Sequence, residues 1–207
     1  LTQAAQALRA SGNAARRNDA LFRLAVDRVF TLAGHGTVVT GTAFAGTARV
    51  GDTLTVMPQG LPVRVRSIHA QNRPVDAGKA GERCALNLAG VERDQLGRGD
   101  WIVAPGLSRP STHVDVELHW LEGSAPLTQW FPLHVHLGTT HVQAHTVLLG
   151  GDTLAPGNTM RVQLVFDTPV RAMPGDRFIV RNPQATATVG GGRVLDPAAP
   201  ERKRRSA

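Results

Sequence analysis

Short runs of alternating apolar and polar residues recur along the chain, separated by turns rich in glycine, proline, asparagine and aspartate. β-Branched and aromatic residues are frequent in these runs, and alternation with a period of two is typical of strands that are buried on one face. The first half contains six such runs, at positions 22–30, 38–44, 53–57, 61–68, 83–88 and 101–103. Short strands at this regular spacing predict a small closed barrel.

A stiff, turn-rich break from Pro105 to Pro110 divides the chain. Six further runs follow it, at positions 112–120, 131–137, 141–149, 160–166, 177–181 and 186–195. We therefore predict an all-β chain made of two consecutive antiparallel β-barrels, at residues 21–107 and 111–197.

The first predicted strand carries an adjacent acid and base, Asp27 and Arg28, among leucine, valine and phenylalanine. A tight turn follows, in which Gly34 and Gly36 supply the positive φ that such a hairpin needs. Neighbouring residues of a strand point to opposite faces, so one of the two charged side chains is expected to point inward or into a cleft. We expect the functional site at this pair.

The chain has 207 residues and a formal net charge of +7, carried almost entirely by arginine, since Lys79 and Lys203 are the only lysines. The planar fork of arginine suits phosphate and carboxylate groups, and a basic chain attracts polyanions, which favours nucleic acid as a partner. An arginine excess also fits a genome of biased base composition, so the charge alone leaves the ligand open.

Cys84 is the only cysteine, which excludes an internal disulfide and a four-cysteine zinc site and indicates a reducing, cytoplasmic setting. No apolar run of about 18 residues is present, so no membrane association is expected. A Walker A loop needs Gly-Lys-Ser/Thr, whereas the only Gly-Lys pair, Gly78 and Lys79, precedes Ala80. We therefore expect no catalytic residues, no cofactor and no enzyme activity in this chain.

Four histidines of the second half, His134, His136, His141 and His145, raise the question of a metal site. An H-x-H pattern on a strand places two imidazoles on one face, with ligand-like spacing. The strands that hold them lack a carboxylate or cysteine to complete a tetrahedral set, and polar side chains on one barrel face are common. No metal site is therefore predicted.

Six motifs are specific when taken together, although each alone is weak. They are Asp27 to Phe30, Gly34 to Gly41, Val50 to Asp52, Ala80 to Leu88, Leu96 to Trp101 and Ala187 to Val194. In these motifs the chain resembles the translational GTPases of the elongation factor Tu type, over their second and third domains. The resemblance implies that both domains are β-barrels, and that together with a GTP-binding domain they hold the aminoacylated end and acceptor arm of a tRNA.

Three further details resemble the bacterial selenocysteine-specific elongation factor of this family. They are the segment from Ala25 to Arg28 with Arg83 further along, the segment from Ile68 to Asn72, and the stretch at 126–136. The resemblance implies that Asp27, Arg28 and Arg83 line the pocket for the selenocysteinyl group.

The chemistry of the ligand agrees with this implication. A selenol is more acidic than a thiol or a hydroxyl, so the selenocysteinyl side chain is an anion at neutral pH and the competing seryl side chain is neutral. Arg28 and Arg83 can distinguish the two, because a partly desolvated cationic pair without an anion costs free energy. Asp27 is expected to orient a guanidinium or to meet the amino group of the esterified amino acid. The alternative is an ordinary surface salt bridge, which contributes about 0–1 kcal/mol and has no function.

The resemblance also implies that the intact protein is a GTPase, binds GTP and Mg²⁺ in another domain, and delivers selenocysteinyl-tRNA to the ribosome. Residues 1–20, with a short helical pattern at 2–10, are then a linker and the end of the GTPase domain. Residues 198–207 are then a basic linker to a carboxy-terminal region that binds a messenger RNA hairpin.

Further candidate tRNA contacts are His35, Arg98, Gly190, Gly191 and Gly192. For Arg98 a structural role as a cap on the first barrel is favoured over a tRNA contact, whereas the three glycines fit equally a bulge at a barrel corner.

Two other functions fit the same residues. One is a fragment of a general elongation or initiation factor without amino-acid selectivity, which binding of several aminoacyl-tRNAs would distinguish. The other is a β-barrel interaction or metal-binding protein with no RNA ligand. Its binding would depend little on salt, whereas binding through several phosphates weakens steeply as salt rises.

Overall fold

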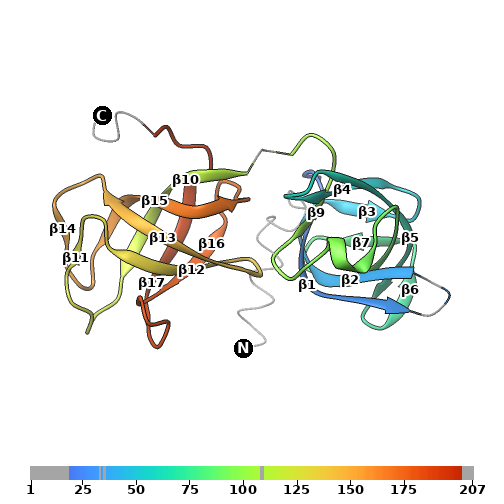
Figure 1. The fold of residues 1–207 in the computed structure, drawn as a ribbon, viewed down its shortest axis with the longest axis horizontal. Coiled ribbons are helices and arrows are strands. Elements are labelled where there is room, and N and C mark those ends of the chain that lie inside the picture. The colour runs from blue at the N-terminus through green and yellow to red at the C-terminus, as the bar shows by residue number, and fades with distance from the viewer. Residues whose placement is uncertain (1–18, 33, 35, 108–109, 202–207) are drawn as a thin grey trace. The chain divides into compact units, whose positions relative to one another are not determined.

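Antiparallel pairing of neighbouring strands builds the whole fold of the computed structural model, which describes residues 19–32, 34, 36–107 and 110–201 (Figure 1). The chain divides into two compact units, Leu1–Leu107 and Ser108–Ala207. The prediction of an all-β chain with two consecutive barrels is confirmed.

The first unit contains a barrel whose strands follow the order β4-β9-β1-β2-β8-β5 and which closes because β4 also pairs with β5. The barrel strands are β1 (Arg23–Leu32), β2 (Gly36–Ala45), β4 (Thr53–Met57), β5 (Leu61–Ala70), β8 (Arg83–Ala89) and β9 (Trp101–Val103). The smaller elements are β3 (Thr47–Arg49), β6 (Arg73–Val75), β7 (Ala77–Lys79) and the 3₁₀ helix η1 (Arg93–Gln95).

The second unit contains a closed barrel of order β10-β15-β13-β12-β16-β17. Its strands are β10 (Ser111–Trp120), β12 (Pro132–Leu137), β13 (Thr140–Leu148), β15 (Thr159–Val170), β16 (Arg177–Arg181) and β17 (Thr188–Asp196). A separate pair, β11 (Leu127–Thr128) and β14 (Thr153–Leu154), lies outside the barrel sheet.

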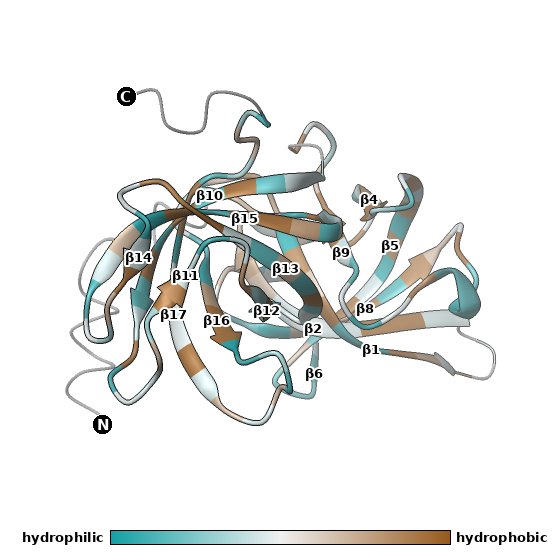
Figure 2. Cartoon of the chain, turned by 60° about the vertical axis from the view of Figure 1, so that its left-hand side comes forward, coloured by the Kyte–Doolittle hydropathy of each residue, from teal (hydrophilic) through white to brown (hydrophobic). Residues whose placement is uncertain are grey.

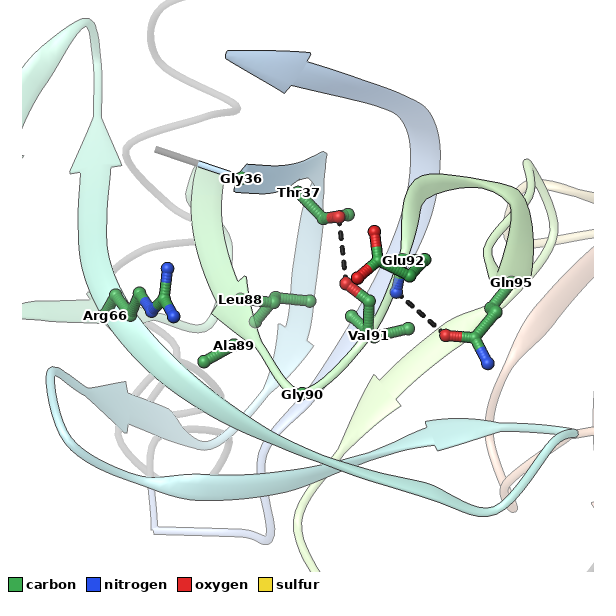
Figure 3. A pocket seen from close by; sticks show the side chains of 9 residues that line it. All are labelled: Gly36, Thr37, Arg66, Leu88, Ala89, Gly90, Val91, Glu92 and Gln95. Atoms are coloured by element: carbon green, nitrogen blue, oxygen red, sulfur yellow. Dashed lines mark hydrogen bonds between the residues drawn. The ribbon is translucent and has the colours of Figure 1, made fainter. Parts of the chain in front are cut away.

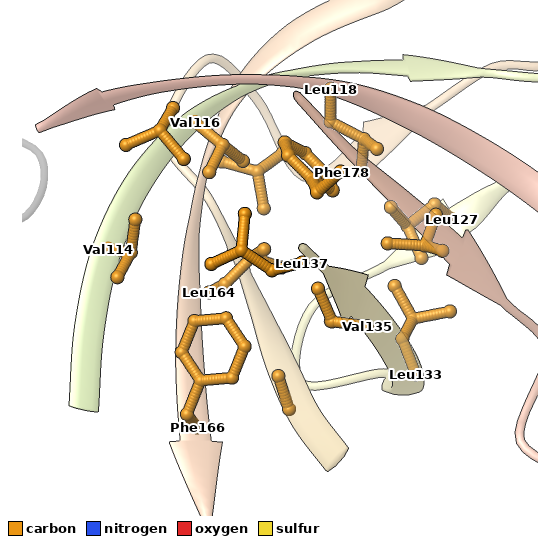
Figure 4. Close-up of a cluster of buried hydrophobic side chains, with 14 of the residues drawn as sticks. Val114, Val116, Leu118, Leu127, Leu133, Val135, Leu137, Leu164, Phe166 and Phe178 are labelled. Atoms are coloured by element: carbon orange, nitrogen blue, oxygen red, sulfur yellow. The ribbon is translucent and has the colours of Figure 1, made fainter. Parts of the chain in front are cut away.

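Each barrel interior is filled by every second residue of its strands. In β10, Val114, Val116 and Leu118 are buried, and they meet Phe166 of β15 and Phe178 of β16 in one cluster (Figure 4). Hydrophobic and hydrophilic bands alternate along the strands in Figure 2, as expected when one face of each strand packs and the other meets solvent. Burial of this kind supplies most of the stabilising free energy of such barrels.

All twelve predicted strands have a counterpart whose ends lie no more than four residues from the predicted ends. Gly34 and Gly36 have φ values of +76° and +83°, so the predicted positive φ on both sides of the first turn is confirmed. His35 and the helical pattern at 2–10 lie outside the described residues.

Candidate functional site

A β-bulge in β1 sets the position of the predicted charged pair. Val26 pairs with Gly41 and Arg28 with Thr40. Asp27 is therefore an extra residue with no opposite residue in the register of β1 and β2. Glycine at position 41 permits this close approach, because an added Cβ would lie 2.0 Å from the carbonyl oxygen of Ala25. The bulge therefore depends on a glycine in the neighbouring strand.

The bulge also changes which way the pair faces. Val26 is fully buried in the barrel core and Val29 packs against the same core, so both intervening residues, Asp27 and Arg28, lie on the outer side. Strict alternation predicted that the two side chains point to opposite faces. The extra residue interrupts that alternation, and both charges are available on one surface.

Asp27 is the centre of a hydrogen-bonded group contributed by three adjacent strands. Arg83 of β8 donates from both terminal nitrogens to the carboxylate, from Nη1 to Oδ2 and from Nη2 to Oδ1, the latter at 2.9 Å. Thr40 of β2 donates from Oγ1 to Oδ1 at 2.8 Å. Sequence reasoning missed Thr40, although its register position opposite Arg28 brings it to the pair.

The electrostatics of the group leave a positive excess. Burial raises the pKa of Asp27, but hydrogen bonds from Arg83 and Thr40 and the charges of Arg83 and Arg28 outweigh it, so the pKa lies below its ordinary value. The hydrogen bond to Asp27 raises the pKa of Arg83 further above its ordinary value. Two guanidinium groups thus face one carboxylate, and within the described residues Arg28 has no ion-pair partner.

The group is open to a ligand. The Arg83 side chain is 54% exposed, Arg28 is exposed, and the Asp27 side chain is 20% exposed. Arginines that are fixed on one side and open on the other can receive an anion without displacing a buried partner. This arrangement can bind and discriminate by charge, and it contains no group poised for covalent chemistry.

Cys84, next to Arg83, is buried. Its side chain points into the barrel core, and burial, with a smaller effect of Glu82, raises the pKa of its thiol to about 11. A thiol in this state is not a reactive thiolate at neutral pH.

The turn that holds Arg98 lies beside the bulge. The backbone nitrogen of Gly99 donates to the carbonyl oxygen of Val26 at 3.1 Å, and the backbone nitrogen of Val26 donates to the carbonyl oxygen of Asp100 at 2.9 Å. Arg98 itself is exposed. The structure thus brings the Arg98 turn to the strand residue that precedes Asp27.

Gly190, Gly191 and Gly192 lie in β17, between β10 and β16. A Cβ would lie 2.7 Å from the carbonyl oxygen of His119 at Gly190, and 1.8 Å from that of Glu117 at Gly192. At Gly191 it would lie 2.8 Å from the carbonyl oxygen of Phe178. Close strand packing alone therefore requires these glycines.

Three of the four histidines contact one another. His134 Nδ1 lies 2.8 Å from His141 Nε2, and the rings of His136 and His141 stack with centroids 4.5 Å apart. Among the described residues, no group of three or more histidine, cysteine or acidic side chains is arranged to hold a metal ion. The described residues likewise offer no set of ligands for the Mg²⁺ that accompanies GTP, and the sequence contains no Walker A loop.

A pocket of about 200 Å³ lies at the end of the first barrel where β2 begins and β8 ends (Figure 3). Arg66 and Glu92 flank it, and Thr37 Oγ1 donates to Val91 O at 2.9 Å in its wall. The pocket shares no residue with the Asp27 group. Its lining brings opposite charges together, so it has no excess of either sign.

The distribution of charge along the chain qualifies the expectation of a basic surface. Of the 23 basic side chains, 8 lie outside the described residues, whereas all 16 acidic side chains lie within them. The described residues therefore carry 15 basic and 16 acidic side chains, a formal charge of −1. The described residues as a whole therefore carry no positive excess. Within the described part of the chain, no helix is long and apolar enough to cross a membrane.

Two family models match the chain. The model of elongation factor Tu domain 2 matches residues 36–103, and that of the β-barrel domain of selenocysteine-specific elongation factors matches residues 114–201. The selenocysteine-specific elongation factor of Escherichia coli (strain K12) is 45% identical over 185 residues, which cover 89% of this chain and 28% of that protein.

Other similar proteins agree with these matches. The selenocysteine-specific elongation factor of Desulfomicrobium baculatum is 41% identical over 192 residues, covering 92% of this chain and 30% of that protein. A crystal structure of a bacterial selenocysteine-specific elongation factor, EF-Sec, superposes with a TM-score of 0.80 at 25% identity, covering 98% of this chain and 32% of that one. The chain thus spans less than a third of the length of these relatives.

Proposed function

Because the chain belongs to the family of selenocysteine-specific elongation factors, we propose that its first barrel holds the selenocysteinyl end of an aminoacyl-tRNA for delivery to the ribosome. The observation that carries this proposal is the uncompensated guanidinium beside Asp27. Arg83 and Thr40 are engaged with the carboxylate, whereas Arg28 lies on the same outer side and keeps its charge free among the described residues.

In this proposal Arg28 and Arg83 bind the selenolate and Asp27 positions Arg83. A carboxylate that accepts two donors from one arginine fixes the plane of the guanidinium, which leaves its remaining edge directed at the ligand. Arg28 supplies the charge that the ligand neutralises. A neutral seryl group leaves that charge unmatched in a partly desolvated site, and this difference favours the selenocysteinyl ligand.

The remaining parts of the cycle belong to the longer protein. We assign GTP hydrolysis, with GTP and Mg²⁺, to a domain that precedes residue 21, and recognition of a messenger RNA hairpin to a region that follows residue 197. Residues 1–20 and 198–207 then connect these parts to the barrels. His35, Arg98 and Gly190 to Gly192 stay candidate contacts to the tRNA.

The test compares arginine variants in the full-length factor. Arg28→Gln and Arg83→Gln each remove one positive charge from the site, and Arg49→Gln removes one from an exposed position on β3 of the same unit. The measured quantity is the ratio of dissociation constants for seryl-tRNA and selenocysteinyl-tRNA. We expect the two site variants to lower this ratio at least tenfold and Arg49→Gln to leave it unchanged.

Equal ratios of the two dissociation constants in all three variants would show that the selenocysteinyl pocket does not lie at Arg28 and Arg83. Loss of affinity for both tRNAs without a change in the ratio would instead favour a general tRNA-binding surface.

A further inference from the structure

Trp130, just before β12, is held in solvent by a strained backbone. Trp130 is 55% exposed, and its φ of +56° is a left-handed value that bulky residues rarely adopt. The fully buried Thr146 fixes this conformation: its carbonyl oxygen accepts from Trp130 N at 2.7 Å, and its Oγ1 accepts from Phe131 N at 3.1 Å. Strain that the surrounding structure maintains is frequent at binding sites.

The exposed indole is part of a group of three side chains, one from the turn before β12 and the others from β13 and β15. Its ring stacks on His145 of β13, with centroids 4.9 Å apart and planes inclined by 15°. Asp167 of β15 lies near His145, with Oδ1 3.9 Å from His145 Nδ1, a separation too long for a hydrogen bond. The Asp167 side chain is 50% exposed, so its carboxylate can accept from a further donor.

The charges near these three side chains favour one kind of planar ligand, a guanidinium, over another, a nucleotide. The 40 residues from Leu121 to Met160, which include β11 to β14, contain no lysine or arginine. On β15, Arg161 is paired with Asp115. A phosphate held next to Asp167 would be repelled by its carboxylate, whereas a guanidinium would gain from the ring face and from the carboxylate.

We propose that Trp130, His145 and Asp167 form a binding site for the guanidinium of an arginine presented by a basic protein segment. The indole and imidazole supply the stacking surface, and Asp167 accepts hydrogen bonds from the edge of the guanidinium. The site is separate from the Asp27 group and does not depend on the function proposed for it.

The test uses the 207-residue chain and an acetylated, amidated peptide of four Arg-Gly repeats. Trp101 and Trp120 are each 3% exposed, so quenching by acrylamide reports mainly on Trp130. We expect the peptide to protect this fluorescence in a saturable manner at low salt. A Lys-Gly peptide of equal length and charge should bind at least threefold more weakly, because an ammonium does not stack.

Variants assign the binding to the three side chains, measured by anisotropy of a fluorescein-labelled peptide. Trp130→Leu and Asp167→Asn are expected to weaken binding at least threefold, and Trp130→Phe, which keeps a ring, to weaken it less. Glu122→Gln makes the same charge change at another exposed position and should leave the affinity unchanged. Equal losses in Asp167→Asn and Glu122→Gln would overturn the proposal, as would equal affinity for the two peptides. Tighter binding of an eight-residue oligouridylate that depends on Trp130 would replace it with a nucleobase site.

Discussion

Replacing Thr40 by valine tests whether the hydroxyl group orders the charged site. Valine keeps the shape of threonine and its preference for strands, so the change removes only the hydrogen bond to Asp27 Oδ1 at 2.8 Å and a weaker contact from Arg83 Nη2 at 3.4 Å. Arg83 still holds the carboxylate in the variant.

The expected magnitude follows from exposure. A hydrogen bond to a charged group contributes about 1.5–3 kcal/mol when buried. Thr40 is half-buried and water can reach Asp27, so we expect Thr40→Val to lower the free energy of unfolding of the first barrel by about 1 kcal/mol at pH 7. The ion pair with Arg83 adds little to this figure, because an exposed pair is screened by solvent.

The effect must depend on pH with a definite sign. The folded pKa of Asp27 lies below its ordinary value of 3.8, so its stabilising effect is complete above that value and is lost as pH falls through the folded pKa. Removing the Thr40 donor raises the pKa of Asp27 toward its ordinary value. The difference between Thr40→Val and wild type should therefore shrink as pH is lowered from 3.8 through the folded pKa of Asp27.

Native-state hydrogen exchange of the β2 and β8 amides measures this difference in the first barrel alone. Thr42→Val is the matched control, since Thr42 is exposed, lies two residues along the same strand and pairs with Arg83. Equal destabilisation by the two variants at pH 7, or a Thr40→Val effect that does not shrink as pH is lowered below 3.8, would refute the reasoning.

Three further outcomes follow from the structure. Gly192→Ala would place a Cβ 1.8 Å from a backbone oxygen and should destabilise the second barrel by about 3 kcal/mol or more in thermal unfolding, whereas Gly97→Ala in the first unit, with nothing within 4 Å, should destabilise its own unit by less than about 1 kcal/mol. Similar melting of both variants would contradict this. Cys84, buried and with a pKa of about 11, should react with iodoacetamide at pH 8 far more slowly in the native chain than in urea, and equal rates would show the thiol to be accessible. Gly41→Ala should displace the bulge and raise the pKa of Asp27 in a carboxyl NMR titration, and an unchanged titration would mean that the bulge tolerates a side chain.

The strands could be predicted because their apolar positions alternate over five or more residues in most cases. The elements that the pattern missed are short. The β3–β7 pair has three residues a side and the β11–β14 pair two, so neither shows a period. Their pairing depends on contacts between distant residues, which a local pattern does not contain.

The site was predicted in part. Asp27 stands out as an acid in an apolar strand, and the family resemblance added Arg83. The register shift between Val26 and Arg28 has no local signal, so the shared outward face of the pair and the role of Thr40 depended on tertiary structure. The net charge of the sequence, in turn, did not reveal that the described barrels are nearly neutral.

The bulge at Asp27 separates two tasks within one strand. Since Asp27 has no partner in the hydrogen-bonded ladder and Arg28 lies on the outer side, we expect substitutions at positions 27 and 28 to leave unchanged which residues of β1 fill the interior. A protein engineer can therefore vary the charge and size of these two side chains to seek a new ligand preference, while the residues that determine folding stay as they are.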